Sequence, residues 1–254
     1  MLRTRFTDLV GCSVPIQLAG MGNLGSPRLA AAVTGAGGLG TVSVYDTRPA
    51  DVAYALDRLA ETVAGPLCAN VILHFVGPDD VVETVATAAA RVRVVDFFYT
   101  DPDPELVKLV HHHGALASWQ VGSREEALAA EAAGCGAVIA QGTEAGGHVR
   151  GTIGLLALLD EVLESVDVPV LAAGGVGSGR TLAAVLAAGA DGAPDRHPLP
   201  RGGGGERTSD LPRGAVRRPR PGHRPHRGLL RRVAHHRAAP AAPLLRRGGR
   251  GVPR

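Results

Sequence analysis

The amino-acid sequence predicts an α/β fold, a (β/α)8 barrel of the TIM type whose eighth βα unit is missing. Through residues 1–192, short apolar runs alternate with longer segments in which apolar residues recur every three or four positions. Glycine clusters follow the ends of several of these runs, and a 254-residue chain has the length of one barrel. A doubly wound open sheet is the alternative fold.

Seven apolar runs rich in Val, Ile, Leu and Ala have the length and composition of buried parallel strands. The predicted strands are residues 16–19, 39–42, 67–71, 94–97, 116–120, 137–141 and 168–173.

Seven helices are predicted after these strands, because apolar residues there follow the helical period. Several begin with a capping side chain, as at Ser26-Pro27 and Asp103-Pro104. Several end in Ala-Gly, where glycine takes the left-handed cap without steric penalty. The predicted helices are residues 27–34, 49–63, 79–90, 104–112, 123–133, 153–166 and 179–188.

The placement of glycine favours the barrel over the open sheet. Gly-rich turns follow predicted strand ends at residues 20–22, 142–151 and 174–177. A barrel brings its ligands close to backbone at the carboxyl ends of its strands, where the absence of a Cβ helps. A nicotinamide-binding Rossmann fingerprint is discounted, because the near match at residues 20–25 runs directly into Pro27.

The candidate catalytic segment is residues 141–148, QGTEAGGH, between a predicted strand and a helix. Its three glycines allow backbone amides to approach a planar or anionic ligand. His148 adds a titratable imidazole at the mouth of the barrel, and a surface histidine without a role is the alternative interpretation.

Residues 137–151, AVIAQGTEAGGHVRG, resemble the signature of the nitronate monooxygenases, formerly called 2-nitropropane dioxygenases. Two further segments agree in order and spacing: PIQLAGMGNLGSPRLAAAVTGAGGLGTV near the start, and VPVLAAGGVGSGRTLAAVLAAGADG at 168–192. The resemblance covers residues 12–192 and implies an FMN-dependent TIM barrel.

The resemblance also implies a role for individual residues. Met21 and Gly22, after the first strand, would lie against the isoalloxazine ring, and Asn70 would hydrogen-bond the flavin. The remaining implied contacts to FMN are Gln141 and Gly146 after the sixth strand, and the phosphate-binding amides of Gly174 and Gly175 after the seventh.

His148 matches the histidine that this family uses in its chemistry, either as a general base toward a neutral nitroalkane or as a hydrogen-bonding partner of the nitronate. The implied reaction oxidises a nitronate with dioxygen to a carbonyl compound and nitrite. The partners are thus a small nitro compound and dioxygen. A flavin-dependent enoyl-acyl-carrier-protein reductase shares much of the pattern and is the alternative enzyme.

Other candidates have simpler explanations. His111, His112 and His113 follow one another directly, so they point around a helix end instead of converging on a metal, and no metal site is predicted. His74 and Gln120 lie near strand ends and are weaker candidates for the pocket.

The sequence composition indicates the cellular compartment in which the protein is expected. No apolar run reaches the ~18 residues of a membrane span, and the first residues contain no hydrophobic signal core. Three cysteines, Cys12, Cys68 and Cys135, match no metal or disulfide spacing. A cytoplasmic protein with small, reduced, buried thiols is therefore expected.

Charge divides the chain in two. Residues 1–192 carry 11 Lys and Arg against 21 Asp and Glu, whereas residues 193–254 carry 16 Arg against 3 acidic residues. The last 62 residues contain no Ile, Phe, Tyr or Trp, a composition that cannot bury a core. The predicted domains are an FMN-binding barrel at 1–192 and a disordered basic tail at 193–254.

The tail begins where the family pattern would enter its eighth strand. With permitted codons and a shift of one base, residues 193–201 become RRIGTRFL. In the same shifted reading frame, residues 206–216 and 225–234 give peptide sequences that resemble those of the family. This suggests a single-base frameshift near codon 193.

If the protein is made with residues 193–254 as given, two consequences are expected. Losing the eighth unit would leave the first and seventh strands unpaired and would weaken FMN binding and activity. The non-enzyme alternative is an inactive barrel remnant whose arginines bind nucleic acid through phosphates. The tail contains no aromatic residue that could stack on bases, so nucleic-acid binding is otherwise not expected.

Overall fold

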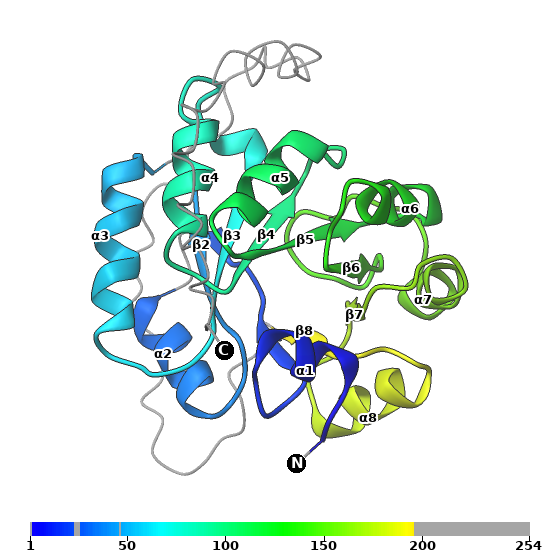
Figure 1. Ribbon diagram of the computed structural model, residues 1–254. Helices are drawn as coiled ribbons and strands as arrows, with labels where there is room; N and C mark the ends of the chain where they lie inside the picture. The colour runs from blue at the N-terminus through cyan, green and yellow to red at the C-terminus, as the bar shows by residue number, and fades with distance from the viewer. Residues whose placement is uncertain (1, 23–25, 46, 196–254) are drawn as a thin grey trace, which may run out of the picture. The chain divides into compact units, whose positions relative to one another are not determined.

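Eight parallel strands alternate with helices in this computed structural model, which describes residues 2–22, 26–45 and 47–195. The helices surround the strands, as Figure 1 shows. The strands are β1 (Ile16–Leu18), β2 (Gly40–Val44), β3 (Leu67–Ile72), β4 (Val94–Phe98), β5 (Leu116–Val121), β6 (Ala137–Gln141), β7 (Val170–Ala173) and β8 (Ala193–Asp195).

All seven predicted helices are present, with ends that differ by up to three residues. They are α2 (Pro27–Gly35), α3 (Pro49–Ala60), α4 (Val81–Ala89), α5 (Pro104–His112), α6 (Arg124–Ala132), α7 (Leu155–Leu163) and α8 (Gly179–Ala187). Two helical elements were not predicted, α1 (Arg5–Val10) and the short 3-10 helix η2 (Leu73–Phe75).

The strands close into a barrel. Strands β2 to β7 form one parallel sheet in sequence order, and β1 pairs with β8. Single bridges join the two groups, Gln17 with Leu39 and Leu171 with Gly192. The predicted barrel is therefore confirmed, and the open sheet is excluded.

One prediction about the barrel is wrong. The tail was expected to begin at residue 193, with the first and seventh strands left unpaired. Instead, Ala193–Asp195 form β8 in register with Ile16–Leu18, and the Ala19 amide donates to the Asp195 carbonyl at 2.9 Å. Backbone groups of Ala193 and Asp195 make these bonds, which is why side-chain composition did not reveal them. Residues 196–254, with the predicted tail and most of the frameshift text, lie outside the described residues.

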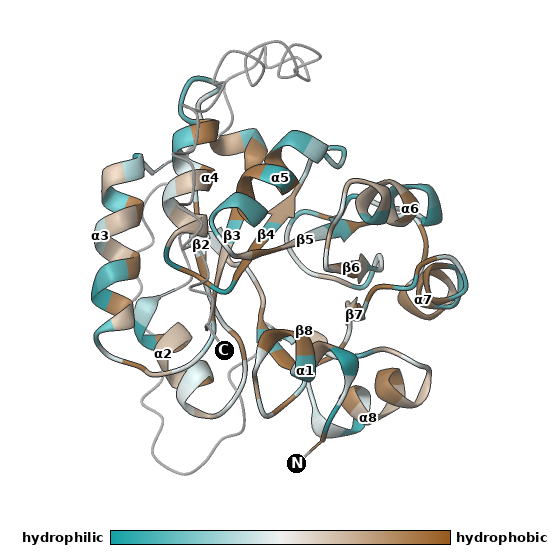
Figure 2. Ribbon diagram, viewed as in Figure 1, coloured by the Kyte–Doolittle hydropathy of each residue, from teal (hydrophilic) through white to brown (hydrophobic). Residues whose placement is uncertain are grey.

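Strand alternation sorts the side chains into two layers. Val95, Phe97 and Trp119 face outward into the large cluster between strands and helices, where the Phe97 and Trp119 rings lie 4.6 Å apart. The inward cluster includes Cys68, Val94 and the α1 side chains. In Figure 2, hydrophilic residues are most prominent on helices α5 and α6.

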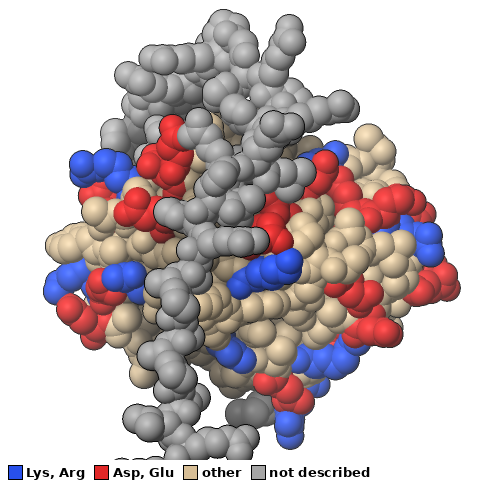
Figure 3. All heavy atoms as spheres, turned by 45° about the horizontal axis from the view of Figure 1, so that its top comes forward, with Lys and Arg blue, Asp and Glu red and all other residues tan. Residues whose placement is uncertain are grey.

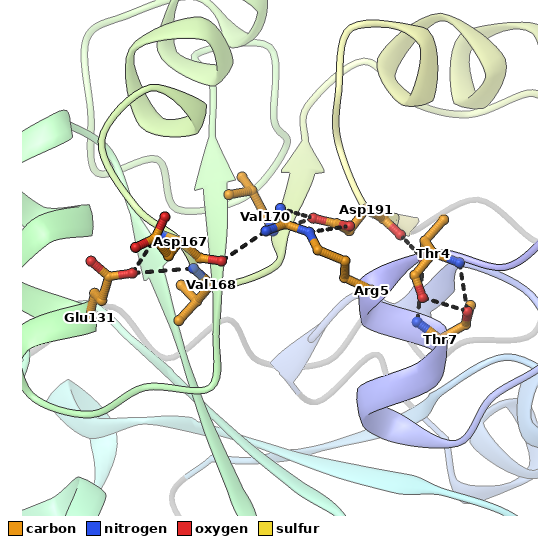
Figure 4. Close-up of polar contacts among 8 residues, drawn as sticks. All are labelled: Thr4, Arg5, Thr7, Glu131, Asp167, Val168, Val170 and Asp191. Atoms are coloured by element: carbon orange, nitrogen blue, oxygen red, sulfur yellow. Dashed lines mark hydrogen bonds and ion pairs between the residues drawn. The ribbon is translucent and has the colours of Figure 1, made fainter.

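Helix α1 covers the floor of the barrel, where the strands begin. Its Phe6 and Val10 side chains are buried against the inward ends of the strands. Arg5 donates two hydrogen bonds to the Asp191 carboxylate, at 3.0 and 2.7 Å, and one to the Asp167 carbonyl. Asp191 also accepts from the Val170 amide at 3.0 Å, so α1 is fixed to the start of β7 (Figure 4).

Charged side chains of both signs are spread over the visible face of the described part (Figure 3). No helix in the described ranges is both long and apolar enough to cross a bilayer.

Candidate active site

The loops that follow the strands lie together at one end of the barrel, because all eight strands are parallel. This end, here called the mouth, carries most of the residues predicted to contact FMN or substrate, whereas Asn70 lies within β3 and Gln141 is the last residue of β6. In a (β/α)8 barrel it is the end where ligands bind.

The turn after β1 is held by a serine on β2. Ser43 Oγ accepts hydrogen bonds from the amides of Met21 and Gly22, at 3.0 and 3.1 Å. Gly20 lies against Asn70, since a Cβ at position 20 would be only 2.1 Å from Asn70 Oδ1. The turn that contains Met21 and Gly22 therefore lies against Asn70 through Gly20.

Asn70 belongs to a buried polar network inside the barrel. Its Nδ2 donates to Asp96 Oδ2 at 2.9 Å, and Ser118 Oγ donates to Asp96 Oδ1 at 3.0 Å. Gln120 Nε2 makes a longer contact to Asp96 Oδ2 at 3.5 Å. Burial raises the pKa of Asp96 to about 7, against the opposing effect of these three hydrogen bonds.

The loop after β6 is shaped by the buried amide of Gln141. Gln141 Nε2 donates to the His148 carbonyl at 3.0 Å, and its Oε1 accepts from the Arg150 amide at 3.2 Å. Arg150 is held in turn by Glu126, at 2.6 Å, and by Asp101. Gln141 therefore positions the loop that carries His148, and the His148 side chain is exposed.

The loops after β6 and β7 touch through bare backbone. A Cβ on Gly174 would lie 3.1 Å from the Ala145 amide nitrogen, and Gly174 has φ +136°. The next residue, Gly175, has φ +65°. Glycine alone adopts such angles readily, so these positions expose backbone without strain. Gly146 lies exposed in the same β6 loop.

A chain of aromatic rings crosses the mouth. Tyr45 packs on Phe75 at 4.5 Å between ring centroids, and Phe75 lies 5.8 Å from His148. Tyr99 lies 5.5 Å from His148 and 5.8 Å from His74. Tyr99 has φ +76°, the only positive value for a residue other than glycine among the described residues, and strain of this kind concentrates at functional sites.

The residues described above that were not predicted as part of the site include Ser43, Asp96, Tyr45, Phe75 and Tyr99. The first two occupy inward positions in the strand alternation, and that pattern could have identified them. Tyr99 follows β4 directly, and aromatic rings at consecutive strand ends are its only sequence signal. Gln120 contacts Asp96, and His74 lies at the mouth on η2.

The other histidines among the described residues lie away from these contacts. His111 and His112 end α5 as predicted, and both are exposed together with His113. Cys68 and Cys135 are buried and Cys12 is half-buried, all as free thiols. Among the described residues, no three His, Cys, Asp or Glu side chains are grouped as metal ligands.

The fold and mouth define the class of this protein: a (β/α)8 barrel with a binding site at the carboxyl ends of its strands. Family comparison is more specific, because the nitronate monooxygenase family model matches residues 3–87 and 74–194. The chain belongs to the nitronate monooxygenase family, a family of flavin-dependent oxidoreductases.

Curated relatives carry more than one name. A Rhodococcus jostii protein named as a dehydrogenase of a hydroxy-methyl-oxo-octahydroindene carboxyl-CoA is 34% identical over 191 residues, which cover 75% of this chain and 53% of the relative. A "probable nitronate monooxygenase" of Staphylococcus saprophyticus is 30% identical over 239 residues, covering 75% and 66%. The chain thus spans about half to two thirds of the length of these relatives.

Solved structures similar to this chain also carry different names. FabK from Thermotoga maritima is 37% identical with a TM-score of 0.72, covering 76% of this chain and 61% of that one. Nitroalkane oxidase from Streptomyces ansochromogenes is 36% identical with a TM-score of 0.69, covering 75% and 66%.

Proposed function

We propose that this protein binds FMN at the mouth and oxidises alkyl nitronates or nitroalkanes. The observation that carries the proposal is the position of His148. It lies between the aromatic rings of Phe75 and Tyr99, on a loop whose backbone touches the glycines after β7.

The residues at the mouth fit a flavin nucleotide. Gly20 lets the turn after β1 lie directly against the Asn70 carboxamide, because a Cβ there would be only 2.1 Å from Asn70 Oδ1. The turn and the amide oxygen would thus form one side of the flavin site. Gly174 and Gly175 present backbone after β7, which is where barrels commonly bind phosphate. Met21, Gly22, Gln141 and Gly146 would complete the cradle.

Bound FMN would supply the electron transfer from substrate to dioxygen. Overall, two nitronate anions and one dioxygen give two carbonyl compounds and two nitrite ions, which balances atoms and charge. The aromatic rings exclude water around the substrate, and the Gln141 amide keeps the His148 loop in place.

His148 is proposed to accept the proton from the α-carbon of a neutral nitroalkane. Imidazole is the side chain that most often serves as a general base in enzymes. A preformed nitronate has already lost that proton, so it needs only binding and orientation.

The test replaces His148 with asparagine and compares a neutral nitroalkane with its nitronate. We expect kcat/KM for the nitroalkane to fall about 10²-fold or more, the usual contribution of a general base, with a much smaller loss on the nitronate. Nitrite release is the measurement, and flavin absorbance reports cofactor content. Equal losses on both substrates would show that His148 is not the base.

A second candidate is an oxidoreductase acting on an acyl thioester, the substrate class of the enoyl-acyl-carrier-protein reductases. The Rhodococcus relative, named as a CoA-ester dehydrogenase, favours it. Nitrite release from a nitronate without a nicotinamide donor selects the first candidate. NADH oxidation that requires an enoyl thioester selects the second.

A further inference from the structure

Asp96 has no role in the proposed reaction, yet it is buried inside the barrel, with an exposed fraction of 1%. Its strand neighbours Val95 and Phe97 face the outer helices, so alternation turns Asp96 inward. The carboxyl group forms no ion pair with any residue in the described ranges. A buried carboxyl group without a cation is expensive unless hydrogen bonds satisfy it.

Hydrogen bonds reach Asp96 from both neighbouring strands. Asn70 stands opposite Asp96 on β3, and Ser118 stands opposite it on β5. The titratable groups near it are the buried thiols of Cys68 on β3 and Cys135 before β6; burial raises the pKa of both thiols, and Asp96 adds to the rise. Asp96 is thus surrounded by neutral donors.

The network decides which atom Asn70 presents to the mouth. Its Nδ2 lies 2.9 Å from the Asp96 carboxyl oxygen and 3.5 Å from the Asp96 carbonyl. Both acceptors engage the nitrogen, so the carboxamide oxygen must face the other way, toward Gly20. The Asn70 oxygen is therefore available as an acceptor beside the turn that contains Met21.

Ser118 allows this arrangement to survive a change of protonation. Its hydroxyl donates to an ionised Asp96 and can rotate to accept the proton of a neutral Asp96. The other carboxyl oxygen then still accepts from Asn70.

We propose that Asp96 is a positioning residue for the flavin site: it fixes the Asn70 carboxamide with its oxygen toward the β1 turn, and Ser118 preserves that orientation in both protonation states. The inference rests on the proposed FMN site for its consequence, which is flavin affinity. The fixed orientation of the Asn70 carboxamide does not depend on bound flavin.

The first experiment measures FMN affinity in the full chain with two matched variants. Asp96→Asn keeps an oxygen that can accept from Asn70 and is expected to bind FMN within about twofold of wild type. Asp96→Leu has the same branched shape, is larger and has no acceptor, and it is expected to lose about tenfold or more, the scale of one lost hydrogen bond to a charged group. Thr41→Val, a buried hydroxyl on β2 outside the network, is the control for perturbing the interior.

The second experiment isolates Ser118. In Ser118→Ala a protonated Asp96 must turn its proton toward Asn70 or Gln120, one of which has to flip. We expect the FMN dissociation constant of Ser118→Ala to rise about fivefold more than that of wild type between pH 8 and pH 6. The same pH dependence in both proteins contradicts the role given to Ser118.

Nuclear magnetic resonance of the flavin-free chain separates this inference from the proposed function. The Asn70 carboxamide signals are those lost in Asn70→Asp, and their hydrogen exchange is expected to accelerate in Asp96→Leu but not in Asp96→Asn. If wild type binds no FMN, the proposed function fails, and these signals still decide the positioning role. Equal exchange, or equal FMN affinity, in both Asp96 variants overturns it.

Discussion

The two ends of the barrel are built from different chemistry. At the floor, Phe6 and Val10 close the interior. The Asp191 carboxylate there accepts hydrogen bonds from Arg5 and from the Val170 amide. At the mouth, His148 is exposed, Tyr99 is strained, and glycine backbone stands bare after β7. The floor is complete within the chain, whereas the mouth presents groups to something else, which separates stability from binding in this molecule.

The largest effect that tests this division is the pH dependence of stability that Asp96 confers. Its pKa is about 7 in the folded chain, against 3.8 for an unperturbed aspartate side chain. The folded state therefore binds a proton between pH 4 and 7 that the unfolded state does not. Stability from this group is fully present below pH 4 and is lost as pH rises through 7, a change of about 4 kcal/mol.

Asp96→Asn removes this titration and serves as the reference protein. We expect the free energy of unfolding of wild type, minus that of Asp96→Asn, to fall by about that amount between pH 4 and pH 8. Urea denaturation at each pH gives both values. Parallel curves for the two proteins would mean that Asp96 is already ionised at acidic pH.

The floor should respond to loss of its buried carboxylate. Asp191→Ala leaves both the Arg5 guanidinium and the Val170 amide without their acceptor, so we expect a loss of about 2–3 kcal/mol in unfolding free energy. FMN affinity should change little, because Asp191 lies at the opposite end from the mouth.

The exposed pair of Arg3 and Asp8 provides the matched control. Its side chains are 75% and 54% exposed, and such pairs contribute little. Asp8→Ala should therefore shift unfolding by less than about 0.5 kcal/mol. A comparable loss of unfolding free energy in Asp8→Ala and Asp191→Ala would show that the hydrogen bonds of Asp191 stabilise the chain no more than an exposed ion pair does.

The sequence predicted the barrel well because hydrophobic periodicity and glycine caps are local signals. Helix α2 begins at Pro27 behind Ser26, as its sequence indicated, and β6 has the predicted limits of residues 137–141. Helix α1 was missed because it has only six residues, and contacts to residues far away in sequence, such as Asp191, stabilise it.

In the site, too, local sequence patterns could not predict contacts between residues that are distant in the sequence. Gln141 was placed at the mouth from its motif, but its hydrogen bonds to the His148 carbonyl and Arg150 amide depend on how the loop returns. Asp96 was not singled out, since a lone acidic residue in an apolar strand has no local partner. Only closure of the barrel brings Asn70 and Ser118 beside it.

The last comparison takes one glycine from each end of the barrel. Gly136 lines a small, mainly apolar cavity at the floor with Phe6, Val10 and Leu116. A Cβ there would meet its nearest atom, Leu116 Cδ2, at 3.5 Å, which is ordinary contact. Gly136→Ala should thus stabilise the chain by about 0.4–1 kcal/mol, by restricting the unfolded state and filling space.

Gly20→Ala at the mouth should have the opposite sign. Its Cβ would overlap Asn70 Oδ1, and Asp96 holds that carboxamide so that it cannot easily move aside. We expect a loss of about 1–3 kcal/mol from overpacking, together with weaker FMN binding. Thermal denaturation of the two alanine variants measures the contrast. If both substitutions stabilise the chain, Asn70 is free to move, and the mouth is less rigidly organised than the hydrogen bonds to Asp96 imply.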